Sequence, residues 1–82
     1  MQVIIVERSF QTPPTDAELK ALGEKQAQCL SIYGVTYKHS ALSHDHRRMI
    51  CMYEAPDTES VRKVQRETGA PYDNIWTGTL VA

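Results

Sequence analysis

Two glutamates, Glu7 and Glu54, each end a short apolar run of the sequence, "VIIVE" and "MICMYE". If these runs are neighbouring parallel strands, they end at the same edge of a sheet and the two carboxylates lie close together. Two close carboxylates can hold a divalent cation or share one proton, as acid and base groups do. The simpler alternative is that each carboxylate pairs with a nearby cation, Arg8, Arg47 or Lys38, or caps a helix start.

His39 and Cys51 form a second pair with metal-binding chemistry, and their separation depends on the register of a hairpin. A turn centred within "SHDHR" sets His39 opposite Cys51, whereas a slip of one residue sets Ser40 there instead. An imidazole, a thiolate and a carboxylate lining one cavity suit Ni(II), Zn(II) or Cu(II) better than hard cations. The alternative is that Cys51 is a small buried hydrophobic residue and that His39 is an exposed or hydrogen-bonded strand residue.

The string "HDH" at residues 44–46 carries two further imidazoles, His44 and His46, within the expected hairpin turn. Histidines two positions apart can chelate an ion, but two or three ligands on an exposed loop make a weak and poorly selective site. Glycine or another small residue is more typical of such a turn. We therefore expect added metal to bind here more readily than a physiological ion.

Three aromatic residues, Tyr53, Trp76 and Tyr37, offer a different chemistry. The hairpin register that pairs His39 with Cys51 also places Tyr37 opposite Tyr53. In a barrel of two sheets, Tyr53 and Trp76 can line an apolar pocket for a small molecule, with Glu54 or His39 as its polar group. The alternative is that the aromatic side chains fill the core or a dimer contact. No nucleophile–base set or phosphate-binding glycine loop is present, so the sequence assigns no enzyme class.

The charge balance excludes an electrostatic grip on nucleic acid or on an anionic membrane. The net charge is −1, the pI is near 6.3, and the Lys and Arg residues are scattered. The apolar run at the start is too short for a secretory signal, and no stretch approaches the ~20 apolar residues of a membrane span. Two cysteines, Cys29 and Cys51, are too few for a disulfide framework. We expect a cytoplasmic protein with reduced thiols.

The patterns of apolar, capping and turn residues along the chain predict six elements that position these side chains. Thr15 followed by Glu18 is a capping-box pattern that starts a helix, and Gly34 suits the left-handed cap that ends it. Asp57 or Thr58 caps a second helix, which Gly69 ends. The expected elements are strand 2–7, helix 16–33, strand 35–42, strand 48–54, a helix from 57 or 58 to 69, and strand 75–82.

The predicted order β-α-β-β-α-β is the split arrangement of ferredoxin-like α+β folds, with residues 1–82 as a single domain. It implies a four-stranded antiparallel sheet of order 4-1-3-2 with two helices on one face, although we expect its central strands, 2–7 and 48–54, to be parallel. Both of these strands are apolar on both faces, and the helices cover only one. The uncovered apolar face therefore predicts a homodimer that packs sheet against sheet.

Four stretches, "VER", "GVTYKHSALSHD", "RRMICMYEAPDTESVR" and "GAPYDNIW", resemble a family of small bacterial nickel-binding-protein-like proteins. The resemblance covers nearly the whole chain, and "CMYEAPD" with its flanks is the most specific part. It implies a dimeric ferredoxin-like α/β-barrel and nickel binding for at least some members, but no particular reaction.

Two functions from different classes follow. The first is a homodimer that binds a divalent metal, which the resemblance implies is nickel, for sequestration or homeostasis. The second is a small-molecule-binding or catalytic dimeric barrel, similar to isomerases or cofactor-free monooxygenases, with an apolar pocket. The first needs the candidate ligands to converge on one ion, and the second needs a cavity lined by the aromatic residues.

Overall fold

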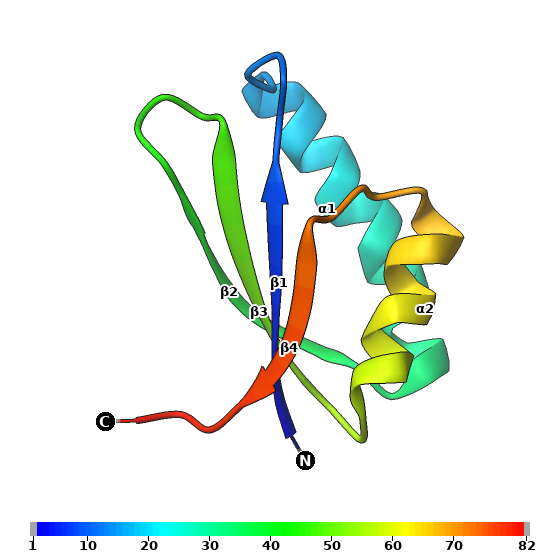
Figure 1. Ribbon diagram of the computed structural model, residues 1–82. Helices are drawn as coiled ribbons and strands as arrows, with labels where there is room; N and C mark the ends of the chain where they lie inside the picture. The colour runs from blue at the N-terminus through cyan, green and yellow to red at the C-terminus, as the bar shows by residue number, and fades with distance from the viewer. Residues whose placement is uncertain (1, 82) are drawn as a thin grey trace.

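Figure 1 shows the computed structural model of the chain, which describes residues 2–81. Within these residues the chain forms the predicted order of elements, with one added 3₁₀ turn. The elements are β1 (Gln2–Ser9), α1 (Asp16–Leu30), the 3₁₀ helix η1 (Ser31–Tyr33), β2 (Thr36–Leu42), β3 (Arg48–Ala55), α2 (Thr58–Thr68) and β4 (Asn74–Gly78). The strand order β2-β3-β1-β4 is the order 4-1-3-2 read from the other edge, which confirms the predicted ferredoxin-like fold.

The central strands β1 and β3 run antiparallel, so the expectation that they are parallel was wrong. The crossover through α1 returns the chain so that β2 runs in the same direction as β1. The hairpin between β2 and β3 then reverses the direction once more. Every pair of neighbouring strands is therefore antiparallel.

The helix boundaries follow the capping residues. The Thr15 hydroxyl accepts from the Glu18 backbone N–H, and the Glu18 carboxylate accepts from the Thr15 N–H, which confirms the capping box. The α-helix ends at Leu30, and the last expected turn is the tighter η1, closed by Gly34 at φ 67°. Asp57 caps α2. No helix within residues 2–81 is long and apolar enough to span a bilayer.

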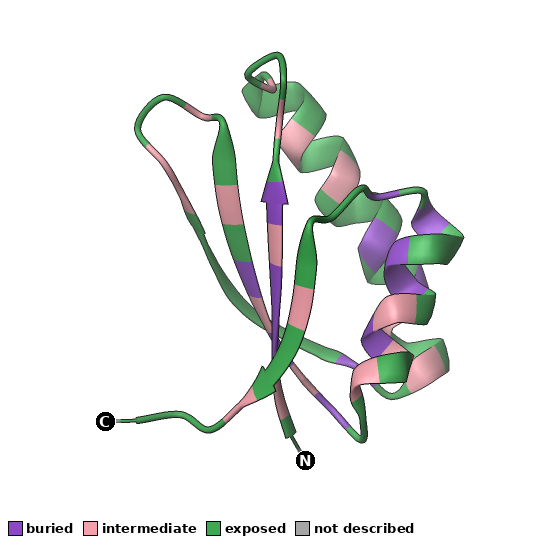
Figure 2. Cartoon of the chain, in the orientation of Figure 1, coloured by how far each residue is buried: buried purple, intermediate pink, exposed green. Residues whose placement is uncertain are grey.

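The molecule has two layers, with both helices on one face of the sheet (Figure 1). Figure 2 shows that burial is concentrated where β1, β3 and α2 meet. The core cluster consists of Ile4, Val6, Cys29, Val35, Cys51, Tyr53, Ala55, Val61 and Val64. The helix face of the sheet is thus the inner face of the monomer.

Successive side chains of β1 point to opposite faces of the sheet, so its apolar side chains form two sets, one on each face. Ile4 and Val6 belong to the core cluster, whereas Ile5 points to the other face of the sheet. Ile5 is nevertheless only 7% exposed, because Met52 of β3 and Trp76 of β4 lie directly opposite it on either side. The expectation that the central strands are apolar on both faces is confirmed.

The edge strand β2 is poorly covered on both faces. All of its residues except Leu42 are exposed, and a register shift between Tyr37 and His39 marks a bulge at Lys38. The backbone of α1 runs close to that of α2 but scarcely approaches that of β2 and β3. This spacing leaves room between α1 and the β2–β3 half of the sheet.

Candidate metal-binding face

The sheet face opposite the helices, which we call the open face, is formed by alternate residues of all four strands. Its centre is apolar, and Ile50 and Trp76 remain 45% and 49% exposed. The open face contains Val3, Ile5 and Glu7 of β1, His39 and Ala41 of β2, Ile50, Met52 and Glu54 of β3, and Trp76 of β4. A contiguous apolar patch of this kind is typical of an interface.

Glu7 and Glu54 both lie on the open face but at opposite ends of it. Glu54 pairs with Val3, whereas Glu7 pairs with Ile50, four residues further along β1. At about 3.4 Å per residue, the two positions are roughly 14 Å apart along the strands. The predicted carboxylate pair was therefore wrong, because it depended on parallel strands.

Each glutamate instead has a local partner. The indole Nε1 of Trp76 donates a hydrogen bond of 2.7 Å to Oε2 of Glu7. The ammonium of Lys38 lies 3.0 Å from Oε1 of Glu54, which is the ion pair weighed as the simpler alternative. Both pairs are accessible to solvent, so either carboxylate can exchange its partner at little cost.

His39 and Cys51 lie on opposite faces of the sheet. The bulge at Lys38 places His39 opposite Met52 on the open face and Ser40 opposite Cys51 on the helix face. Cys51 is buried in the core cluster. The structure therefore has the slipped register near Cys51, and a ligand set that joins His39 to Cys51 is excluded by geometry.

His44 and His46 lie in the exposed hairpin turn. The turn is closed by a hydrogen bond of 2.9 Å from the His46 N–H to the Ser43 carbonyl. The Asp45 carboxylate accepts from the Ser43 hydroxyl and from the Arg47 N–H, and these bonds lower the pKa of Asp45. The carboxylate between the two histidines is thus already used by the loop itself.

The three aromatic residues do not line one pocket. Tyr37 and Tyr53 are opposite one another, as predicted, and their rings meet edge to face with centroids 5.8 Å apart. Both point to the helix face, whereas Trp76 lies on the open face. The expected barrel pocket of Tyr53 and Trp76 is therefore wrong for this chain.

The burial of the Arg8 side chain was not predicted from the sequence. Arg8 is 2% exposed, and its guanidinium donates to the Pro71 carbonyl, the Gln65 side-chain oxygen and the Cys51 sulfur. Its Nε has no partner within residues 2–81. The period of two that buries Ile4 and Val6 also points to Arg8, but the strand was expected to end at Glu7.

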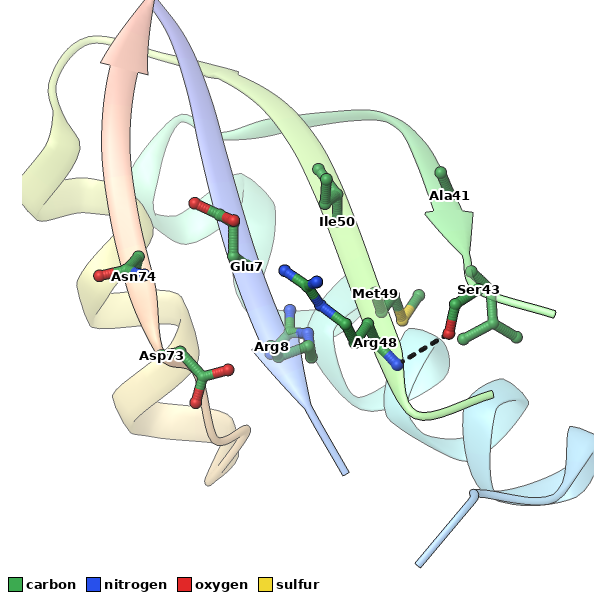
Figure 3. A pocket seen from close by; sticks show the side chains of 10 residues that line it. Glu7, Arg8, Ala41, Ser43, Arg48, Met49, Ile50, Asp73 and Asn74 are labelled. Atoms are coloured by element: carbon green, nitrogen blue, oxygen red, sulfur yellow. Dashed lines mark hydrogen bonds between the residues drawn. The ribbon is translucent and has the colours of Figure 1, made fainter. Parts of the chain in front are cut away.

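A mixed-charge hollow of about 410 Å³ extends from the start of β4 across β1 and β3 to the end of β2 (Figure 3). The carboxylates of Glu7 and Asp73 line it together with Arg8 and Arg48. Two carboxylates are too few to hold a metal ion unaided, and no group of three His, Cys, Asp or Glu side chains within residues 2–81 is placed to do so. One copy of the chain therefore does not by itself fit a nickel ion.

Comparison with known proteins agrees with this architecture. A crystal structure of SCO4226 from Streptomyces coelicolor A3(2) superposes with a TM-score of 0.87, covering 98% of this chain and 99% of that one at 18% identity. Among curated proteins, no sequence matches. The family model described as nickel responsive protein SCO4226-like matches residues 5–77. The chain belongs to this SCO4226-like family, in agreement with the resemblance seen in its sequence.

Proposed function

We propose that the protein binds nickel as a homodimer and acts in the sequestration or homeostasis of the metal. One observation carries the proposal: three side chains of types that can ligate nickel, His39, Glu7 and Glu54, share the apolar open face. The description of the family as nickel responsive supports the choice of metal. Imidazole and carboxylate are ligands that nickel accepts.

The apolar centre of the open face supports the homodimer. Ile5, Ile50, Met52 and Trp76 lie side by side on three strands. Ile5 is already buried in one copy, so the gain comes mainly from Ile50 and Trp76, which are 45% and 49% exposed. Covering the exposed halves of these two side chains in both copies contributes roughly 3–6 kcal/mol before the entropy of association is subtracted. This term favours the packing of two open faces against each other.

The homodimer also supplies the ligands that one copy lacks. His39 and Glu54 lie on the neighbouring strands β2 and β3. His39 is opposite Met52 and Glu54 is opposite Thr36, so His39 and Glu54 are diagonal to one another on the same face. A two-fold axis that passes close to His39 and Glu54 would bring the same two side chains of a second copy alongside them. Two imidazoles and two carboxylates then complete a four-ligand set for Ni(II). Metal binding is expected to depend on the dimer.

The compartment follows from the same proposal. Cys29 and Cys51 are free thiols. Reduced thiols are usual in the cytoplasm, where a nickel buffer would meet the imported metal. We therefore place the function in the cytoplasm, with the metal ion and a second copy as partners and with no role for nucleic acid or membrane.

The test is a calorimetric titration of tag-free protein with Ni, Zn, Co and Cu, combined with sedimentation to read the oligomer. We expect saturable nickel binding at one ion per dimer, lost in His39→Ala and in Glu54→Ala while both variants remain dimers. A double variant, His44→Ala with His46→Ala, is the matched control and should bind nickel as the parent does. Loss of binding only in the double variant would mean that nickel binds incidentally to the turn histidines and not to the open face.

A further inference from the structure

A second hollow, of about 250 Å³, lies on the helix face between α1 and the β2–β3 strands. It exists because α1 packs along α2 and stands away from the edge of the sheet. Protein interiors are normally filled to crystal-like density, so an unfilled volume of this size in a small domain needs a reason. Most of its wall is apolar and comes from Leu19, Leu22, Ala27, Leu30 and Met49.

Gly23 forms part of this wall, in the middle of α1. Glycine is less favourable than alanine at the interior of a helix. Apart from its chain neighbours and the nearby backbone of α1, no heavy atom of the described residues lies within 4 Å of the place where a Cβ would stand, so packing within the chain does not demand a glycine here. A molecule that lies against the helix backbone would demand it.

The polar end of the hollow is a short chain of hydrogen bonds. Ser40 Oγ donates to Cys51 Sγ at 3.2 Å and lies 2.7 Å from Tyr37 Oη. Since the single Ser40 proton is used on the sulfur, Tyr37 donates to Ser40. The Tyr37 oxygen then keeps free lone pairs and can accept a hydrogen bond from a ligand.

Size and lining restrict the ligand further. A cavity of about 150 Å³ holds benzene, with six non-hydrogen atoms, so 250 Å³ suits about ten. No charged side chain is among the lining residues described, and burial of an unpaired charge there is unfavourable. The edge of Tyr37 also offers an aromatic contact, since its ring is 47% exposed.

We propose that this hollow binds a small, uncharged aromatic molecule with one hydrogen-bond donor, of the phenol or indole class. The wall contacts the ring, the Tyr37 oxygen accepts the donor, and Gly23 lets the ring approach α1. The site lies on the opposite face of the sheet from the open face, so it is independent of the proposed nickel function and of the dimer.

The first test titrates indole into the metal-free protein and follows amide and methyl NMR shifts. We expect a dissociation constant on the order of 1 mM or below, with shifts centred on α1 and β2. Gly23→Leu fills the hollow with a better helix former and should abolish these shifts. An absence of binding to the parent, or equal binding to Gly23→Leu, would overturn the proposal.

Comparison of ligands tests the polar end. Tyr37→Phe removes the acceptor on a half-exposed side chain, so the fold is expected to persist. It should weaken indole binding about fivefold and leave naphthalene, which has no donor, unchanged. Equal weakening of both ligands, or tighter binding of the anion benzoate than of indole, would contradict the assigned chemistry.

Alkylation of the cysteines gives a readout that survives even where Gly23→Leu fails to fold. Both cysteines belong to the buried core cluster, but only Cys51 lines the hollow, so Cys29 serves as the internal reference. Indole should slow the reaction of Cys51 with iodoacetamide, measured by peptide mass spectrometry, and leave Cys29 unchanged. Equal rates at Cys51 with and without saturating indole would place the ligand elsewhere.

Discussion

The hydroxyl of Tyr53 donates a hydrogen bond of 2.7 Å to the side-chain oxygen of Gln26, across the gap between β3 and α1. The Gln26 amide in turn donates to Gln65 of α2, whose oxygen also accepts from Arg8. All four side chains are buried. One polar chain thus joins both helices to the two central strands, inside a core that is otherwise apolar.

We expect Tyr53→Phe to lower the free energy of unfolding by about 1–3 kcal/mol. The substitution keeps the ring but leaves the Gln26 oxygen buried without its donor, which costs its desolvation. Urea unfolding followed by circular dichroism measures the loss. Gln26→Leu in the Tyr53→Phe background is the control, because removal of both partners should recover part of the stability. A change below about 0.5 kcal/mol would mean that the bond contributes nothing net.

The stability of the parent protein should fall at alkaline pH because of the same hydroxyl. Burial, aided by the nearby Cys51, raises the pKa of Tyr53 to about 12 from its ordinary value of 10.0. The folded state therefore holds this proton more tightly than the unfolded state, so its contribution is complete below about pH 10 and is lost as the pH rises through 12.

The loss amounts to at most about 3 kcal/mol, since the shift is about two pKa units and each unit corresponds to about 1.4 kcal/mol. Unfolding curves at several pH values between 8 and 12 measure it. The difference between parent and Tyr53→Phe isolates the residue from other groups that titrate in the same range. A difference that stays constant over the whole pH range would show that folding does not change the pKa of Tyr53.

The sequence predicted the elements better than their directions. Capping residues with fixed local chemistry, such as Thr15, Gly34 and Gly69, place helix ends correctly because the interactions span only a few residues. The relative direction of β1 and β3 depends on the whole path through α1 and the hairpin. Because this direction was predicted wrongly, Glu7 and Glu54 were expected to lie close together. Each residue was assigned to the correct strand, but in the structure the two lie at opposite ends of the open face.

A single bulge explains why the predicted pairing of His39 with Cys51 was wrong. Tyr37 faces Tyr53 as expected, but the extra residue Lys38 shifts the register, so that Ser40 and not His39 reaches Cys51. A period of two carries no information on such an insertion. The polar chain through Arg8 and Gln65 was missed for a different reason: partners more than 50 residues apart leave no local pattern.

His46→Gly should stabilise the protein by about 0.5 kcal/mol. His46 has φ 61°, a left-handed conformation that is unfavourable for a residue with a Cβ, and the gain is reduced by the greater freedom of glycine in the unfolded chain. The thermal midpoint, which should rise by a few degrees, is the measurement. His44→Gly, at a position without positive φ, is the matched control and should give no gain. A loss of stability at position 46 would show that the imidazole makes contacts worth more than the backbone strain.

Substitutions at two isoleucines, one on β1 and one on β3, distinguish the core of one copy from the proposed dimer contact. Ile4 is fully buried against the helices, so Ile4→Lys should unfold the chain by forcing an unpaired charge into the core. Ile50 is 45% exposed on the open face and lies opposite Glu7, so one copy tolerates Ile50→Lys. A lysine from each copy placed within the proposed apolar contact should raise the dimer dissociation constant by at least about 100-fold, because a charge is buried there. Sedimentation and circular dichroism distinguish the outcomes: a folded monomer is expected for Ile50→Lys, whereas an unchanged dimer would exclude the open face as the contact.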